Sequence, residues 1–286
     1  MRCMEGEELK IGDVHGHVNP LRGMGPRALA RKFVKSGGWL YGLVNLTSWS
    51  LGVSAMKADD YRRLYKATIK AADEMRREGL IVPVVLGPHP AEFVRLVESG
   101  VPIEKATKVI IKAYDIAADY VKEGVAHGLG EAGRPHWSVP QEYIEACNTI
   151  TRHVLSLSAE LEVPIHLHME SSENAVRDAA SLSRDTGASK VVFHHIKGSL
   201  AKLAIELGII PSIPARRVEL EESVEAWPRV VIESDFLDDP KKPGAVVAPW
   251  SISRTINKLL AKGLIDEGKA FEVLVKNPAS LYCIGI

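Results

Sequence analysis

Two histidines near the N-terminus, His15 and His17, stand two residues apart in the segment Asp13-Val14-His15-Gly16-His17. On an extended chain, such residues point to the same face. Two imidazoles can then bind one metal ion, each at about 2.0–2.1 Å for zinc. Gly16 has no side chain to obstruct their approach, and Asp13 lies on the same face as a supporting residue. The motif alone fits two surface histidines in a loop equally well, so its interpretation depends on the rest of the chain.

Further side chains of the types that bind metals stand at the ends of later apolar runs. In the run 163–168, both histidines share a face. His168 ends the run and is the better ligand, whereas His166 lies one step deeper and fits a core histidine with a hydrogen-bond partner. His194 and His195 are adjacent, so only one of them can face the interior of a barrel. The full set is Glu131, His166, His168, His194, His195, Glu233 and Asp235.

Eight short apolar runs alternate with longer amphipathic stretches, and these elements would carry the residues. We expect strands at about 9–15, 39–46, 80–87, 124–130, 163–168, 190–195, 208–213 and 229–235. The clearest helices are predicted at 58–78, 103–122, 141–161, 199–207, 252–262 and 266–274. This alternation implies parallel strands, either closed into a (β/α)8 barrel or opened into a doubly wound sheet.

The strand count and the chain length favour the barrel, an α/β fold of the TIM type, as a single domain over residues 1–286. No GxGxxG or GxxxxGK[ST] segment follows the first run, which counts against the common open-sheet nucleotide folds. Barrel enzymes place their active sites at the carboxyl ends of the strands. The candidate residues all stand at such ends.

The bulk composition restricts the setting and the partners of the chain. Apolar residues make up 46% and charged residues 25%, and Lys plus Arg balance Asp plus Glu at 36 each. No overall basic field therefore attracts nucleic acid, although a local basic patch could still do so. Three cysteines, at 3, 147 and 283, form no CxxC pair, which indicates a reducing compartment. Without a signal-peptide core or an apolar run of about 18 residues, we predict a cytoplasmic protein with no membrane contact.

Convergence of the candidate side chains at one end of a barrel would create a metal site. Four imidazoles and two carboxylates are a ligand set for one or two divalent ions with open positions for water. Nitrogen and oxygen ligands suit Zn²⁺ or Mn²⁺, with Mg²⁺ as a further candidate. Such ions lower the pKa of bound water to about 7 and polarise the oxygen under attack, which predicts metal-dependent hydrolysis. The ligands would be His15, His17, Glu131, His168, one of His194 and His195, and Asp235.

The order of these motifs resembles the amidohydrolase superfamily and, within it, the TatD-like branch of metal-dependent hydrolases and DNases. The segment Gly87-Pro88-His89-Pro90 resembles the GxHP of that family, Gly130-Glu131-Ala132-Gly133 its GEIG, and Glu233-Ser234-Asp235 its ETD. His194-His195-Ile196-Lys197-Gly198 is similar to its HCFSG, which implies that His194 is the ligand and that His195 lies on the other face. The resemblance spans nearly the whole chain.

The resemblance also implies roles for two carboxylates. Glu131 would bridge two ions. Asp235 would bind the ion held by His15 and His17, and would act as the general base for the attacking water and later as the acid for the leaving group.

The segment after His168 departs from the family pattern. TatD-like nucleases follow this histidine with an arginine, as in HCRDA, whereas Met169-Glu170-Ser171 follows it here. An arginine fork suits a phosphate group, and Glu170 would repel one. Arg134 or Lys197 could supply the lost positive charge, so we treat both, together with His89, as candidates for substrate binding.

Two enzymatic functions and one non-enzymatic alternative follow. The resemblance favours hydrolysis of a phosphodiester of the deoxyribonuclease type, with DNA as the partner. The missing arginine and the zero net charge favour hydrolysis of a small amide, lactone or phosphoester instead. A barrel that keeps its ligands for stability alone is disfavoured, because structural sites tend to be closed and four-coordinate. Weaker candidates for substrate contact are His136, Trp137 and the run Lys241-Lys242-Pro243.

Overall fold

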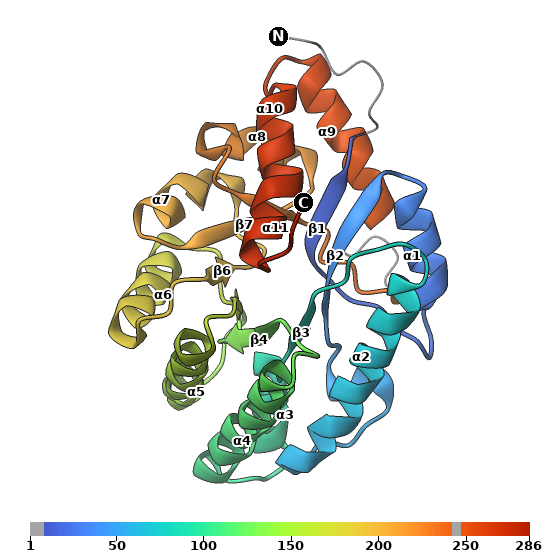
Figure 1. Ribbon diagram of the computed structural model, residues 1–286. Coiled ribbons are helices and arrows are strands. Elements are labelled where there is room, and N and C mark those ends of the chain that lie inside the picture. The colour runs from blue at the N-terminus through green and yellow to red at the C-terminus, as the bar shows by residue number, and fades with distance from the viewer. Residues whose placement is uncertain (1–8, 242–246) are drawn as a thin grey trace.

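Eight parallel strands form the barrel in the computed structural model, which describes residues 9–241 and 247–286 (Figure 1). The strands follow one another in chain order around the sheet. The Asp235 N–H donates to the His15 carbonyl at 2.9 Å and the His17 N–H to the Phe236 carbonyl at 2.7 Å, so the end of the last strand joins the first. The predicted (β/α)8 barrel is confirmed. The strands are β1 (Ile11–Gly16), β2 (Gly38–Val44), β3 (Val84–Leu86), β4 (Gly128–Gly133), β5 (Ile165–His168), β6 (Val191–Phe193), β7 (Ile210–Pro214) and β8 (Val231–Glu233).

Helices cover the outside of the barrel, as Figure 1 shows. They are α1 (Pro26–Val34), α2 (Tyr61–Arg76), α3 (Pro90–Glu98), α4 (Ile103–Lys122), α5 (Gln141–Leu161), α6 (Glu173–Thr186), α7 (Ala201–Glu206), α8 (Arg217–Ser223), α9 (Ile252–Ala261), α10 (Glu267–Phe271) and α11 (Asn277–Leu281). Helices α4 and α5 have the predicted bounds. The helix predicted at 266–274 is instead α10 followed by a π-helical turn over Glu272–Lys276.

Helices α1, α3, α6, α8 and α11 were not among the clearest predicted ones, and α6 illustrates why. Its buried face consists mainly of alanines, together with Val176, Leu182 and Ser183. Small residues give a weak apolar periodicity, which is the main sequence signal for a helix. The start of α6 is nevertheless well defined, because the Ser172 side chain accepts a hydrogen bond from the Ala175 N–H at 3.2 Å.

Two apolar cores hold the barrel together. The larger core lies between the strands and the surrounding helices. The smaller core fills the barrel interior, where Leu281 and Tyr282 at the end of α11 pack against Val14, Val85 and Val192. In Figure 1 this C-terminal segment lies across the barrel opening. The segment closes the barrel at the amino ends of the strands. The polar candidate residues lie at the opposite end, where the strands have their carboxyl ends.

Membrane insertion was predicted to be absent. Along the described parts of the chain, no helix has both the length and the apolar character that a membrane crossing requires.

Candidate metal centre

The first strand carries two imidazoles that turn toward Glu131, and a glycine between them allows close packing. A Cβ atom on Gly16 would lie 2.2 Å from Tyr41 Oη. The same hydroxyl donates to the His17 carbonyl at 3.1 Å. His17 Nδ1 donates to the Val44 carbonyl at 3.0 Å, which leaves a lone pair on Nε2. Strand packing therefore sets both the position and the tautomer of His17.

Glu131, in β4, presents one carboxylate oxygen to these imidazoles. Its Oε1 lies 3.6 Å from His15 Nε2 and 3.4 Å from His17 Nε2. Asp235 follows β8, and its Oδ1 lies 3.7 Å from His17 Nε2. The side chain of Asp235 is 19% exposed, whereas the other three are buried. These four residues form the first ligand group, which the sequence analysis predicted.

The second oxygen of Glu131 faces a second ligand group. Its Oε2 lies 3.1 Å from His168 Nδ1 and 3.5 Å from His194 Nε2. His194 Nδ1 donates to Glu233 Oε1 at 3.0 Å, so its Nε2 also carries a lone pair. One carboxylate thus stands between two sets of imidazoles, as the family resemblance implied for Glu131.

His89 lies beside the second group with the opposite tautomer. Its Nε2 is 3.7 Å from Glu131 Oε2. Its Nδ1 accepts the Ala91 N–H at 3.0 Å, at the start of α3. A neutral His89 therefore carries its proton on Nε2 and presents a donor to the site. Asn45, at the end of β2, holds the preceding loop by hydrogen bonds to both backbone groups of Gly87, at 2.8 and 2.9 Å.

The spacing of these atoms fits divalent ions. Nitrogen–oxygen distances of 3.1–3.6 Å around Glu131 exceed the 2.9 Å limit typical of charge-assisted hydrogen bonds. Two ligand atoms that share a tetrahedral ion with bonds of 2.0–2.1 Å are separated by about 3.4 Å. His15 Nε2 and His168 Nε2 are buried without a hydrogen-bond partner. Buried polar atoms normally have partners, so unpaired nitrogens in this cluster support a metal centre.

Charge in the cluster also favours ion binding. Burial raises the pKa of Glu131, but the surrounding histidines outweigh burial and hold that pKa well below its ordinary value. Burial lowers the pKa values of His168 and His194. The carboxylate is therefore anionic while these imidazoles are neutral, which is the state that a metal ion requires of its ligands.

A hydrogen-bond chain inside the barrel orients His15. Its Nδ1 lies 2.9 Å from His166 Nδ1, and His166 Nε2 lies 3.0 Å from Tyr282 Oη. The Tyr282 hydroxyl must donate to the Val14 carbonyl, 3.0 Å away, because a carbonyl oxygen can only accept. Tyr282 then accepts from His166 Nε2, and His166 Nδ1 accepts from His15 Nδ1. This direction leaves the lone pair of His15 on Nε2, toward Glu131.

Two further carboxylates support the ligands from behind. Glu233 is fully buried and also accepts the His195 N–H at 2.7 Å and the Ser212 hydroxyl. Asp13 accepts the N–H groups of Ser234 at 2.9 Å and His15 at 3.3 Å, and burial raises its pKa to about 7. The predicted supporting role of Asp13 is thus exerted through the backbone that joins β1 to β8.

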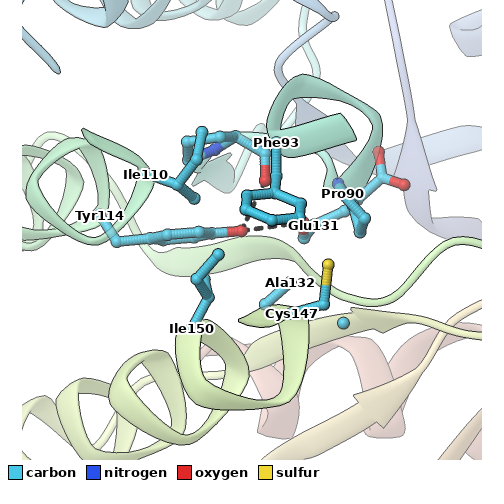
Figure 2. Close-up of a pocket in the computed structure, with 10 residues that line it drawn as sticks. Pro90, Phe93, Ile110, Tyr114, Glu131, Ala132, Cys147 and Ile150 are labelled. Atoms are coloured by element: carbon cyan, nitrogen blue, oxygen red, sulfur yellow. Dashed lines mark hydrogen bonds between the residues drawn. The ribbon is translucent and has the colours of Figure 1, made fainter. Parts of the chain in front are cut away.

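Tyr114 of α4 fixes the backbone of Glu131, and Figure 2 shows its hydroxyl directed at this residue. The Oη atom lies 2.8 Å from the Glu131 carbonyl and 2.7 Å from the Pro88 carbonyl. The surrounding cavity of about 10 Å³ is lined mainly by apolar side chains such as Phe93 and Ile150. That space holds one water molecule at most, so it belongs to the packing behind the site.

Arg134 is not the free cation that the sequence led us to expect. Its Nε donates to Glu170 Oε2 at 2.9 Å, and its Nη2 donates to Asp178 Oδ2 at 2.9 Å. Two carboxylates thus neutralise the guanidinium, which is only 8% exposed. Lys197 is exposed, and its backbone N–H donates to Ser171 Oγ at 2.8 Å. Lys197 therefore remains as a cation near the site.

The prediction that His195 lies on the other face from His194 is wrong. Strand β6 ends at Phe193, so the alternation of side chains no longer applies beyond it. His195 has a φ of 46°, in the left-handed region, and its Nε2 lies 3.3 Å from His168 Nδ1. His136, one of the weaker candidates, lies with its ring tilted against that of His168, at 4.8 Å between ring centroids. Both residues therefore lie at the site.

The remaining candidates are placed less closely. Trp137 is exposed and its ring contacts that of His136 at 5.5 Å between centroids. Of the run Lys241-Lys242-Pro243, only Lys241 belongs to the described residues, where it is exposed. Sequence reasoning missed Asn45 and Tyr282, since neither lies in a motif and their partners are distant in sequence.

Comparison with known proteins agrees with this geometry. The family model described as TatD related DNase matches residues 12–283. An uncharacterised protein of Methanocaldococcus jannaschii is 29% identical over 283 residues, which cover 96% of both chains. A TatD homologue from Escherichia coli has a TM-score of 0.67 at 16% identity, covering 98% of this chain and 100% of the other. The phosphotriesterase homology protein from Escherichia coli, solved with phosphate in its active site, has a TM-score of 0.64 at 10% identity, covering 96% and 99%.

At these identities the two solved structures establish the shared barrel fold. The family match goes further, because it spans nearly the whole length and so includes the strand ends that carry the histidines and Glu131. The chain belongs to the TatD-related DNase family and is a metal-dependent hydrolase.

Proposed function

We propose that this chain hydrolyses phosphoester bonds, with a phosphodiester of the deoxyribonuclease type as its substrate. The observation that carries the proposal is the Glu131 carboxylate, whose two oxygens face separate imidazole groups. Family membership supports the same chemistry. The related Escherichia coli protein that holds phosphate in its active site supports a phosphorus centre.

The two ligand groups would hold one divalent ion each. His15, His17 and Asp235 share Glu131 with His168 and His194. Such a mixed nitrogen and oxygen set suits Zn²⁺ or Mn²⁺, and Mg²⁺ is a further candidate. Bound there, divalent ions acidify water and polarise the oxygen under attack.

Asp235 is the residue that we assign to proton transfer. Its carboxylate is partly exposed at the edge of the first ligand group, whereas Glu131 is enclosed by imidazoles. A general base must reach the attacking water, and the exposed position meets that requirement. Asp235 would then return the proton to the leaving group.

Substrate binding falls to residues around the second ligand group. His89 offers an Nε2 donor toward the site, and Lys197 offers an exposed cation. Arg134 acts indirectly in this proposal, because its pairing with Glu170 and Asp178 holds the loop after β4 against the loop after β5 and against helix α6.

A second candidate function rests on the same arginine pair. Because Arg134 is neutralised, the site has less positive charge than a phosphodiesterase needs for a long anionic substrate. This charge balance favours a small amide, lactone or phosphoester. We also propose that the chain works in a reducing compartment, the cytoplasm, because Cys147 and Cys283 are unpaired.

A substrate panel with each metal tests the proposal. The chelator-treated chain, reloaded with Zn²⁺, Mn²⁺ or Mg²⁺, is assayed on a DNA oligonucleotide, a small phosphodiester, an ester, a lactone and an amide. Cleavage of the oligonucleotide that falls steeply with salt supports the nuclease. Turnover of the lactone, ester or amide alone would support the second candidate. No turnover with any metal would contradict both.

Asp235→Asn tests the proposed base. Because Asp235 is also a proposed ligand, the variant is assayed at saturating metal ion, where it should lose about 10²–10⁴-fold in turnover. The matched control is Asp239→Asn, in the same loop, whose partly exposed carboxylate accepts the Lys241 N–H at 2.9 Å. Unchanged hydrolysis by Asp235→Asn would rule out this role.

A further inference from the structure

We propose that His136, His168 and His195 form a third metal site at the barrel mouth, which binds a divalent ion of the zinc class. One ring nitrogen from each residue lies within 4.8 Å of the others. His136 and His195 belong to neither ligand group around Glu131. The proposed ion is therefore additional to the two ions of the proposed hydrolase centre.

Three separate loops bring these imidazoles together. His136 lies three residues beyond β4, His168 ends β5, and His195 lies two residues beyond β6. Ring centroids are 4.8 Å apart for His136 and His168, 5.6 Å for His136 and His195, and 4.6 Å for His168 and His195. The backbone of His195 adopts a left-handed φ of 46°, which is unfavourable for a residue other than glycine. Its N–H is anchored on Glu233.

The atoms of the cluster are spaced for coordination. The rings of His195 and His168 lie close together, with His195 Nε2 at 3.3 Å from His168 Nδ1. His168 is 6% exposed, and its Nε2 is buried without a partner. His168 would serve both sites through its two ring nitrogens: Nδ1 faces Glu131 and would bind the ion there, and the unpaired Nε2 would bind the third ion.

The imidazoles of His136 and His195 are not engaged in ion pairs among the described residues. In the chain as described, no carboxylate forms an ion pair with the ring of His136 or His195. The Arg134 guanidinium, in the same loop as His136, is held by Glu170 and Asp178. Its charge is thus paired with carboxylates and does not oppose an ion at the cluster.

The ligand type determines which ions fit. Three imidazoles without a carboxylate suit Zn²⁺, Co²⁺, Ni²⁺ or Cu²⁺, whereas Mg²⁺ prefers oxygen ligands. His136 is exposed, so the site opens to solvent. Three protein ligands leave a position for water or for a substrate oxygen, which is characteristic of catalytic zinc sites.

Metal counting tests the third site without an activity assay. The chelator-treated chain is equilibrated with Zn²⁺, Co²⁺ or Mg²⁺, freed of excess ion by gel filtration, and analysed by elemental mass spectrometry. The wild type should retain three Zn²⁺ or Co²⁺ ions per chain, but no more than two Mg²⁺ ions. The visible spectrum of the Co²⁺ form should report a tetrahedral nitrogen site.

His136→Gln should lose one Co²⁺ ion and the tetrahedral absorption, since this exposed residue can be replaced without disturbing the core. His195→Gln should lose the same ion. The matched control is His153→Gln, on α5, because His153 Nε2 pairs with Asp115 at 2.8 Å and has no role in the cluster. The control should retain three ions.

Two results would overturn the third site. One is a wild type that retains no more than two Zn²⁺ or Co²⁺ ions at saturation. The other is a His136→Gln variant that retains as many as the wild type. A chain that binds three ions but hydrolyses no substrate would contradict the proposed function and leave the third site standing.

Discussion

The hydrogen-bond chain behind His15 leads to a quantitative prediction. Replacing His166 by phenylalanine should weaken divalent-ion binding at the first ligand group by about 10–100-fold. In the wild type, His166 Nδ1 accepts from His15 Nδ1 at 2.9 Å, so that His15 Nε2 carries the lone pair. Phenylalanine has a similar volume but offers no acceptor.

The magnitude follows from burial. His15 is fully buried, so an ion on Nε2 would require its Nδ1–H to remain unpaired in the variant. An unsatisfied buried donor costs about 1–3 kcal/mol. Each 1.4 kcal/mol corresponds to a tenfold change in a binding constant, so the expected loss spans roughly one to two powers of ten. Without an ion, His15 can adopt the other tautomer and avoid this cost.

Calorimetric titration of the chelator-treated chain with Zn²⁺ measures the loss directly. Tyr282→Phe should weaken binding in the same direction but less, because it removes only the acceptor for His166 Nε2. The matched control is Tyr65→Phe, which removes another buried hydroxyl that donates to a backbone carbonyl, Ala113, at 3.1 Å. This control should bind Zn²⁺ as the wild type does.

Nitrogen-15 NMR provides a second measurement that packing alone would not change. In the metal-free wild type, the proton of neutral His15 should reside on Nδ1. In the His166→Phe variant, the Nε2–H tautomer should gain population. Folded His166→Phe protein with wild-type Zn²⁺ affinity and an unchanged His15 tautomer would refute the reasoning.

Three further predictions concern the supports of the site. Gly16→Ala should abolish metal retention, measured by elemental analysis, because the new Cβ would lie 2.2 Å from Tyr41 Oη in β2. Retention of metal at the wild-type level would contradict the packing argument. Burial raises the pKa of Glu170, but hydrogen bonds from Arg134 outweigh it and leave that pKa below its ordinary value of 4.5. The ionised Glu170 carboxylate thus stabilises the folded chain above pH 4.5, and this stabilisation is lost as the pH falls through the lowered pKa. In plots of the free energy of unfolding against pH, Glu170→Gln should therefore show a smaller fall at acid pH than the wild type. The same fall in both proteins would count against this prediction. Asp238→Ala should lower the free energy of unfolding by about 3 kcal/mol, because the buried carboxylate accepts three backbone N–H groups. Asp239→Ala, a change at a partly exposed neighbour whose carboxylate accepts the Lys241 N–H, should leave it nearly unchanged.

Local patterns were sufficient for the barrel and for most of the ligand positions. An apolar run that ends in a polar residue identifies a strand end, and the parallel arrangement then brings distant ends to one face. His168 and Glu131 are separated by 37 positions in the sequence, yet adjacent strands place their side chains 3.1 Å apart. The alternation of strands and helices contains this information, because it specifies which ends converge.

Local patterns could not predict which side chains pair with one another when they come from distant parts of the sequence. The acidic neighbour of Arg134 in the sequence, Glu131, faces the histidines, and Arg134 instead pairs with residues that lie 36 and 44 positions later. The sequence therefore shows a cation, whereas the fold pairs that cation with two carboxylates. His166 likewise reads as a core histidine until its two partners, in β1 and after α11, are known.

The His194–His195 pair shows where a local rule ends. Alternation of side chains holds only while the chain remains extended, and β6 stops at Phe193. One residue in the left-handed region at position 195 is enough to bring both rings to the same mouth. A family pattern with cysteine at this position implies one ligand there, whereas this chain has two imidazoles and a third, His136, against them. The strand end at which this chain replaces the cysteine of the family pattern is thus where the structure adds imidazoles, and under the proposal of a third site the metal chemistry of this chain should differ from the family pattern at that point.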